Sequence, residues 1–187
     1  MIDISRRQFM GAVGATAAAS AFSMPAIAAG KTIKIGAVQP FSGGLELFGN
    51  QAKMGLDLAV SEINAGGGIL GHQGEMLYED NKTDPKTSVE RAKKLIERDE
   101  VLAISGPITS AGRDAMAATM ERGKTPLLYA TNYEGGICNR YLFSFNTVPN
   151  QDTAPLIPYL KDEGIGDSYY MFGADYVWPR NMFKTAK

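Results

Sequence analysis

The sequence contains very few of the side chains that most often carry catalysis or hold metal ions. Cysteine, histidine and tryptophan occur once each among 187 residues, as Cys138, His72 and Trp178. A single cysteine excludes an internal disulfide, so the stability of the fold has to come from a packed core. A single histidine, with no nucleophile motif beside it, provides neither a catalytic triad nor a zinc ligand set. We therefore predict that the protein is not an enzyme and that it holds no metal and no cofactor.

An excess of charge of one sign is also missing. Nineteen lysines and arginines stand against 20 acidic residues, so the net charge is −1, and no segment interleaves basic with aromatic side chains. This balance excludes nucleic acid as a partner. The glycine-rich segments 42–44 and 66–68 lack the spacing of phosphate-binding loops and are predicted as turns. The acidic pair Glu79 and Asp80 is expected to cap a strand end or face solvent rather than perform acid–base catalysis.

The first 28 residues are typical of an export signal. An arginine pair at 6–7 lies in the run S-R-R-Q-F-M, an apolar stretch follows at 11–24, and A-I-A at 26–28 forms a cleavage site. The apolar stretch is too rich in alanine and glycine, and too short, to predict a membrane anchor. The S-R-R-x-F-M run resembles a twin-arginine signal. We predict that the export machinery delivers the protein to the periplasm and that the mature chain starts at Ala29.

After the signal, short apolar runs alternate with amphipathic stretches. Strands are expected at 32–38, 75–79, 101–105, 126–129 and 168–172, and helices at 49–64, 85–96 and 111–122, with further helices opening near 151 and 179. The first helix is expected to bury one face, made of Ala52, Leu56, Ala59 and Ile63. This alternation predicts an α/β fold, in which a parallel sheet carries helices on both faces. We expect a first α/β lobe at 29–150, followed at 151–187 by a crossover and the incomplete start of a second similar lobe.

Polar residues follow the predicted strands at four places. The segments are Q-P-F-S at 39–42, G-P-I-T-S at 106–110, A-T-N-Y-E at 130–134 and G-A-D-Y at 173–176. Ligands of open parallel sheets bind beyond the carboxyl ends of the strands, where these four segments fall. Their hydroxyl, amide and carboxylate groups, together with two tyrosines, suit a small polar solute held by hydrogen bonds against an aromatic wall. Ser110 is also a plausible simple helix cap, and the two roles are compatible.

Several motifs together resemble the type I periplasmic solute-binding proteins that serve ABC transporters for branched-chain amino acids, urea and short-chain amides. They read G-A-V-Q-P-F-S-G at 36–43, I-N-A-G-G-G-I-L-G at 63–71 and E-D-N-K-T-D-P at 79–85. Three further runs are similar to the urea and amide branch, and they read Y-E-G-G at 133–136, P-N-Q-D-T-A-P-L at 149–156 and G-A-D-Y-V-W-P-R at 173–180. Members of this family are about twice as long and close two lobes over the solute by a hinge.

The resemblance implies a receptor that captures urea, a short-chain amide or a related small polar solute and delivers it to the permease of an ABC transporter. Carried over position by position, the ligand contacts fall on Phe48, Ser110, Thr131, Tyr133, Asp175 and Tyr176. Two alternatives stay open, an amino-acid-binding receptor of the same fold and the sensor domain of an amide-responsive signalling system. Because the second lobe would enclose the solute, we expect the 187-residue chain to bind it less tightly than a complete receptor.

Overall fold

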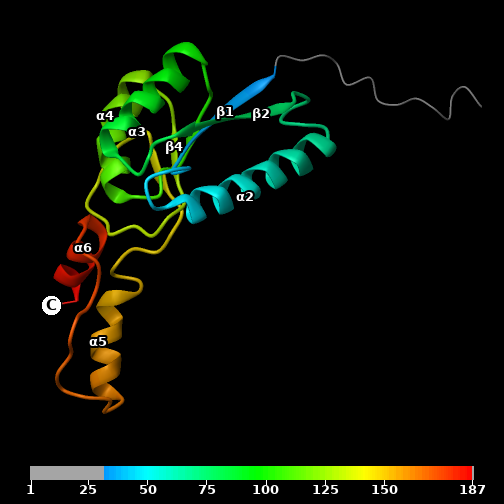
Figure 1. Ribbon diagram of the computed structural model, residues 1–187. Coiled ribbons are helices and arrows are strands. Elements are labelled where there is room, and N and C mark those ends of the chain that lie inside the picture. The colour runs from blue at the N-terminus through cyan, green and yellow to red at the C-terminus, as the bar shows by residue number, and fades with distance from the viewer. Residues whose placement is uncertain (1–31, 187) are drawn as a thin grey trace, which may run out of the picture.

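The computed structural model describes residues 32–186, which form an α/β unit followed by two helices that extend away from it (Figure 1). Its strands are β1 (Ile33–Gln39), β2 (Gly74–Asp80), β3 (Ile104–Ser105), β4 (Leu127–Tyr129) and β5 (Leu142–Ser144). Its helices are α2 (Glu46–Ala65), α3 (Pro85–Lys93) with the π-helical turn η1 (Lys94–Arg98), α4 (Ser110–Gly123), α5 (Thr153–Asp162) and α6 (Val177–Thr185). The predicted export signal lies outside the described residues.

The five strands form one sheet in the order β2-β1-β3-β4-β5, and every neighbouring pair is parallel. The predicted α/β fold with a parallel sheet is therefore confirmed. The strand order reverses at β1, because α2 leads outward to β2 whereas α3 leads back across β1 to β3. Figure 1 shows α2 on the opposite side of the sheet from α3 and α4. The helices on either side leave a crevice at the carboxyl ends of β1 and β3, where open α/β sheets bind ligands.

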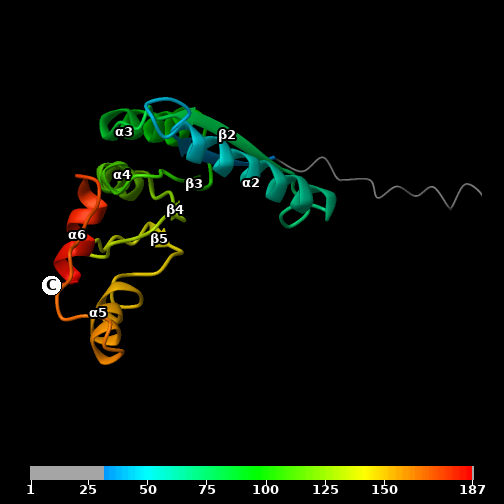
Figure 2. The same ribbon diagram turned by 60° about the horizontal axis from the view of Figure 1, so that its bottom comes forward.

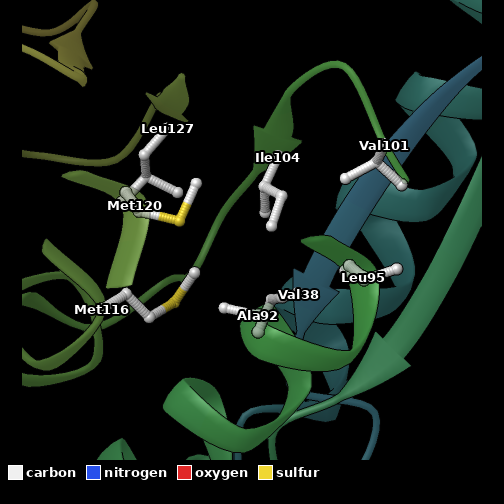
Figure 3. Packing of buried hydrophobic residues seen from close by; sticks show 8 residues of the cluster. All are labelled: Val38, Ala92, Leu95, Val101, Ile104, Met116, Met120 and Leu127. Atoms are coloured by element: carbon white, nitrogen blue, oxygen red, sulfur yellow. The ribbon is translucent and has the colours of Figure 1, made fainter. Parts of the chain in front are cut away.

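The hydrophobic core lies between the sheet and the layer formed by α3, η1 and α4 (Figure 3). Its buried residues are Val38, Ala92, Leu95, Val101, Ile104, Met116, Met120 and Leu127. Gly36 on β1 makes this close packing possible, since a Cβ atom there would lie 2.8 Å from Cδ1 of Leu95 and 3.2 Å from Cγ1 of Ile104. The core therefore anchors α3, η1 and the C-terminal half of α4 against the sheet.

The predicted apolar face of the first helix is only partly right. Ala52 and Leu56 are half-buried as expected, but Ala59 and Ile63 are exposed. The helix α2 instead faces β1 and β2 along the row that continues from Leu56 to Val60, which is half-buried. Residues four apart and residues three apart follow different lines around a helix. The apolar pattern alone does not show which of the two lines, the one to Ala59 or the one to Val60, faces the sheet.

Two sequence predictions about strands are wrong. Residues 168–172 form no strand, and Tyr170 and Phe172 are 92% and 90% exposed. A strand requires a neighbour for its backbone hydrogen bonds, and this segment lies beside the helices α5 and α6. Conversely, the sequence predicts no strand between residues 130 and 167, but β5 lies there and pairs with the free edge of β4. Pairing partners, rather than local β-propensity, decided both cases.

The two C-terminal helices lie beside each other at one end of the sheet, away from α2 (Figure 2). Helix α6 also contacts α4, so the first turn of α6 approaches the end of the sheet where the predicted ligand loops lie. No helix within residues 32–186 has both the length and the apolar character that crossing a membrane would require.

Candidate functional site

A hollow of about 750 Å³ lies at the carboxyl edge of the sheet and is the candidate ligand site. Loops before α2, α3 and α4, the loop after β4, and the first turn of α6 form its walls. The lining residues are Gly43, Gly44, Leu45, Phe48, Thr83, Pro85, Ile108, Thr109, Ser110, Ala111, Tyr129, Thr131, Asn132, Tyr176, Val177 and Trp178. None of them carries a charge, and aromatic rings stand on both sides.

Four helix N-termini meet at this hollow. Helices α2, α3 and α4 each follow a parallel strand and so start at the same edge of the sheet, whereas α6 follows no strand. Thr109 caps α4 by accepting a hydrogen bond from the backbone N–H of Gly112 at 3.3 Å. Asp84 caps α3 by accepting from the N–H of Thr87 at 2.6 Å, and this bond holds the pKa of Asp84 below its usual range. The remaining N–H groups of a first helical turn have no partner within their helix and carry partial positive charge. The hollow thus offers backbone donors to a ligand oxygen.

The loop between β1 and α2 is held in place by Asp80 at the end of β2. The carboxylate of Asp80 accepts hydrogen bonds from the N–H groups of Phe41 and Ser42 at 2.9 and 3.2 Å, and from Oγ of Ser42 at 2.6 Å. Burial alone would raise the pKa of Asp80, but these hydrogen bonds outweigh it and lower the pKa. Its partner in the acidic pair, Glu79, forms ion pairs with Arg91 and Lys94 and is 9% exposed, so it does not face solvent. Asp80 is thus a cap, as predicted.

A buried ion pair lies directly behind Ser110. The guanidinium of Arg113 donates to both carboxylate oxygens of Glu134, at 2.8 and 3.3 Å, and Oγ of Ser110 donates to the same carboxylate at 2.9 Å. The side chains of Arg113 and Glu134 are 1% and 2% exposed. The guanidinium lies over the rings of Tyr129 and Tyr133, at 4.9 and 4.7 Å from the ring centroids, where cation–π attraction stabilises it.

The charge of Arg113 survives this burial. Desolvation by itself would lower the pKa of Arg113, but hydrogen bonds to Glu134 and to Asp114 outweigh it and raise the pKa above its ordinary value. Asp114 is half exposed and lies 2.8 Å from the same guanidinium nitrogen that contacts Glu134. One buried cation is therefore shared by two carboxylates, and only that of Glu134 contacts a residue of the hollow.

The structure brings together four of the six predicted ligand contacts. Phe48, Ser110, Thr131 and Tyr176 line the hollow. Tyr133 does not, because its hydroxyl donates to the carbonyl of Ile137 at 2.8 Å and accepts from the N–H of the same residue at 3.0 Å.

Asp175 also lies outside the hollow. Its exposed side chain accepts a hydrogen bond from Arg180 at 2.6 Å. Ligand contact at all six positions stays a prediction.

Trp178 is a wall residue that the sequence reasoning did not single out as a contact. It lines the hollow from the first turn of α6, next to Tyr176, and its buried indole Nε1 has no hydrogen-bond partner among the described residues. Its aromatic ring adds to the apolar wall of the hollow. The signal was present in the sequence, since the only tryptophan of the chain stands two residues after a predicted contact.

Gly106 allows α4 to start so close to the end of β1. Its φ of +108° lies in a region that residues with a Cβ atom rarely adopt, and a Cβ there would lie 2.2 Å from the carbonyl oxygen of Val38. The turn after β3 therefore requires glycine, and it places Ser110 at the edge of the hollow.

Within residues 32–186, no group of three or more histidine, cysteine or acidic side chains is placed to hold a metal ion. Cys138 is exposed and free. The arrangement instead combines hydroxyls, backbone N–H groups and aromatic rings around an uncharged hollow. Such groups can hold a small polar molecule by hydrogen bonds.

The fold defines the class, an α/β protein with a parallel sheet and a hollow at the carboxyl ends of its strands. The family model described as periplasmic binding protein matches residues 32–187, so the chain belongs to the periplasmic binding protein family. The family membership that the motifs predicted is thereby confirmed.

Among curated relatives, the Leu/Ile/Val-binding protein homolog 7 of Brucella abortus is 35% identical over 111 residues, which cover 57% of this chain and 28% of that protein. The solved structure of the branched-chain amino acid transporter substrate-binding protein LivJ from Streptococcus pneumoniae, in complex with isoleucine, is 27% identical with a TM-score of 0.68. The match covers 83% of this chain and 45% of that one.

A second solved structure, an ABC transporter solute-binding protein from R. palustris in complex with 4-hydroxybenzoate, is also 27% identical, with a TM-score of 0.71. It is covered to 44%, and this chain to 83%. The chain thus spans less than half the length of these relatives.

Proposed function

We propose that this protein is an extracytoplasmic solute-binding receptor that captures a small polar molecule and presents it to the permease of an ABC transporter. The observation that carries the proposal is the uncharged hollow at the switch point of the sheet, lined by Ser110, Thr131 and the N-terminus of α4. Membership of the periplasmic binding protein family supports the location outside the cytoplasm, and relatives that carry solutes for ABC transporters support the partner.

We further propose that the solute is urea, a short-chain amide or a closely related neutral molecule. An amino acid carries an ammonium and a carboxylate group, and each requires a partner of opposite charge when it is buried. No lining residue of the hollow is acidic or basic. A neutral amide requires only hydrogen-bond donors and acceptors, which the hydroxyls and N–H groups supply.

A titration followed by NMR tests this proposal on the chain itself, since NMR detects weak binding. Urea or acetamide should shift the backbone amide signals of Ser110, Ala111 and Thr131, whereas leucine and 4-hydroxybenzoate at equal concentration should shift them less. Tighter binding of leucine than of either amide would instead favour the amino-acid receptor. If no solute shifts these signals, the receptor function is wrong.

The sensor alternative uses the same hollow and differs in its partner. Deletion of the gene should abolish uptake of the labelled solute by intact cells if the protein serves a transporter. Unchanged uptake, together with a lost transcriptional response to the solute, would favour a sensor.

A further inference from the structure

We propose that Glu134, held by Arg113, is a positioning residue that accepts the hydrogen bond donated by the Ser110 hydroxyl. As a result, the hollow selects ligands that donate hydrogen bonds over ligands that carry a carboxylate. The inference rests on the proposed receptor function and specifies the chemical class that this site accepts. Neither Glu134 nor Arg113 lines the hollow, so both act through Ser110.

The first step concerns the charge of Glu134. The guanidinium of Arg113 is almost completely buried and donates two hydrogen bonds to this carboxyl group, in the paired geometry that stabilises both charges. A neutral Glu134 would leave a buried cation with a single carboxylate, that of half-exposed Asp114. Glu134 is therefore ionised, and an ionised carboxylate only accepts hydrogen bonds.

The second step concerns the proton of Ser110. Because Glu134 only accepts, the 2.9 Å contact between Ser110 Oγ and Glu134 Oε2 is one in which Ser110 donates. A serine hydroxyl has one proton and two lone pairs. Ser110 therefore presents only lone pairs to a ligand in the hollow.

Thr131, the second predicted hydroxyl contact, also donates its hydroxyl proton to another group of the protein. Its Oγ1 donates to the carbonyl oxygen of Pro107 at 3.3 Å, since a carbonyl has no proton to give. Both hydroxyls at the end of the sheet thus face the hollow as acceptors.

The donors of the hollow come from a different source. They are the backbone N–H groups in the first turn of α4, where Ser110 and Ala111 line the hollow. A ligand complementary to the whole site has an oxygen acceptor and an N–H donor side by side, as a primary amide or urea has. A carboxylate carries two acceptors, so one of its oxygens would meet the lone pairs of Ser110 or Thr131 without a proton between them.

The substitution Glu134→Gln tests the positioning role. The glutamine oxygen would take the stronger contact to Arg113, and its NH₂ group would donate to Ser110 Oγ. The serine proton would then be free to turn toward the ligand, while the volume of the side chain stays the same. Asp114→Asn is the matched control, because it removes the same charge next to the same guanidinium without contacting Ser110.

The probes are acetamide and acetate, which have nearly the same shape, titrated by NMR into the full chain and the two variants. The wild-type chain should prefer acetamide. Glu134→Gln should reduce the acetamide-to-acetate affinity ratio by about tenfold or more, because Ser110 would then donate a hydrogen bond to the ligand instead of accepting one. Asp114→Asn should leave the ratio within about twofold, since its half-exposed charge is screened by solvent.

A second variant keeps the test valid if Glu134→Gln fails to fold. Ser110→Ala retains the pair of Arg113 and Glu134, and it should weaken acetamide binding while leaving acetate binding unchanged or improved. A wild-type preference for acetate, or a ratio that is the same in Glu134→Gln and wild type, would overturn the positioning role even though the hollow binds solute. No shift of the hollow's signals with either probe would overturn the receptor function itself.

Discussion

At the scale of single residues, the charged pair behind Ser110 is held by contacts on several sides. Arg113 contacts two carboxylates and two tyrosine rings while its side chain is 1% exposed. This surrounding accounts for the place of Tyr133, whose ring lies against the guanidinium and does not line the hollow. A buried charge that loses its partner costs much more than the pair contributes, because the remaining charge is left without solvent.

The first prediction follows from this asymmetry. Arg113→Met should lower the free energy of unfolding by about 3–5 kcal/mol, since it leaves the carboxylate of Glu134 buried without a cation. The double variant Arg113→Met/Glu134→Gln should recover part of that loss, because no buried charge remains. Urea denaturation of both variants measures the effect. Arg180→Met, which removes an exposed ion pair, is the control and should change stability little. Equal losses in the single and double variants would contradict this account.

At the scale of elements, the start of α4 decides where the hollow lies. The turn after β3 passes through Gly106 with a positive φ and lies against the carbonyl of Val38 at the end of β1. Parallel strands place their following helices at one edge, but the close approach of these two turns is what brings Ser110 into the hollow between α2 and α4.

A pair of glycine substitutions tests this arrangement. Gly106→Ala should destabilise the fold by about 1–3 kcal/mol, because its Cβ would clash with a backbone oxygen and its φ would be strained. Gly55→Ala in the exposed middle of α2 should stabilise it by about 0.5–1 kcal/mol, since no atom lies within 4 Å of the added Cβ and alanine favours a helix. Thermal unfolding of both variants measures the expected loss and gain of stability. An unchanged stability of Gly106→Ala would show that the turn can adopt another backbone conformation.

At the scale of the whole molecule, the hollow joins two parts of the chain that are distant in sequence. The end of the sheet supplies one wall, and the first turn of α6 supplies the other through Tyr176, Val177 and Trp178. Figure 2 shows α6 beside α4, so both helix N-termini reach the same space. The lining residues of the two walls are at least 44 positions apart in the sequence, the distance from Asn132 to Tyr176.

Removal of the second wall should therefore weaken binding. Trp178→Ala should reduce the affinity for acetamide by about tenfold, because a large aromatic part of the wall is lost. Phe172→Ala is the matched control, since this ring is 90% exposed and lies outside the hollow. Unchanged acetamide binding by Trp178→Ala would show that α6 is not part of the site.

The export prediction also concerns the whole molecule. Replacing the arginine pair at 6–7 with lysine should strongly reduce the amount of protein in the periplasm, because the twin-arginine pathway requires that pair. Mass spectrometry of the periplasmic fraction measures both the yield and the start of the mature chain, which should be Ala29. A soluble cytoplasmic product with an intact N-terminus would contradict the assignment.

The sequence by itself determined the features that depend on local pattern. The β-branched run of β1 and the Asp84-Pro85 start of α3 placed two elements correctly, because strand and capping preferences act over a few residues. Alternation of such elements was enough for the parallel α/β fold, and the strand ends that follow from it include Ser110 and Thr131, which line the hollow.

Only the tertiary structure decided what depends on partners distant in the chain. It turned Tyr133 onto Arg113, brought Glu134 behind Ser110 across 24 positions, and left residues 168–172 without a strand to pair with. The sequence does not show whether a carboxylate faces solvent or accepts a hydrogen bond in a buried site. Which of these holds is set by packing, since desolvation and hydrogen-bond geometry are properties of the folded surroundings rather than of the residue.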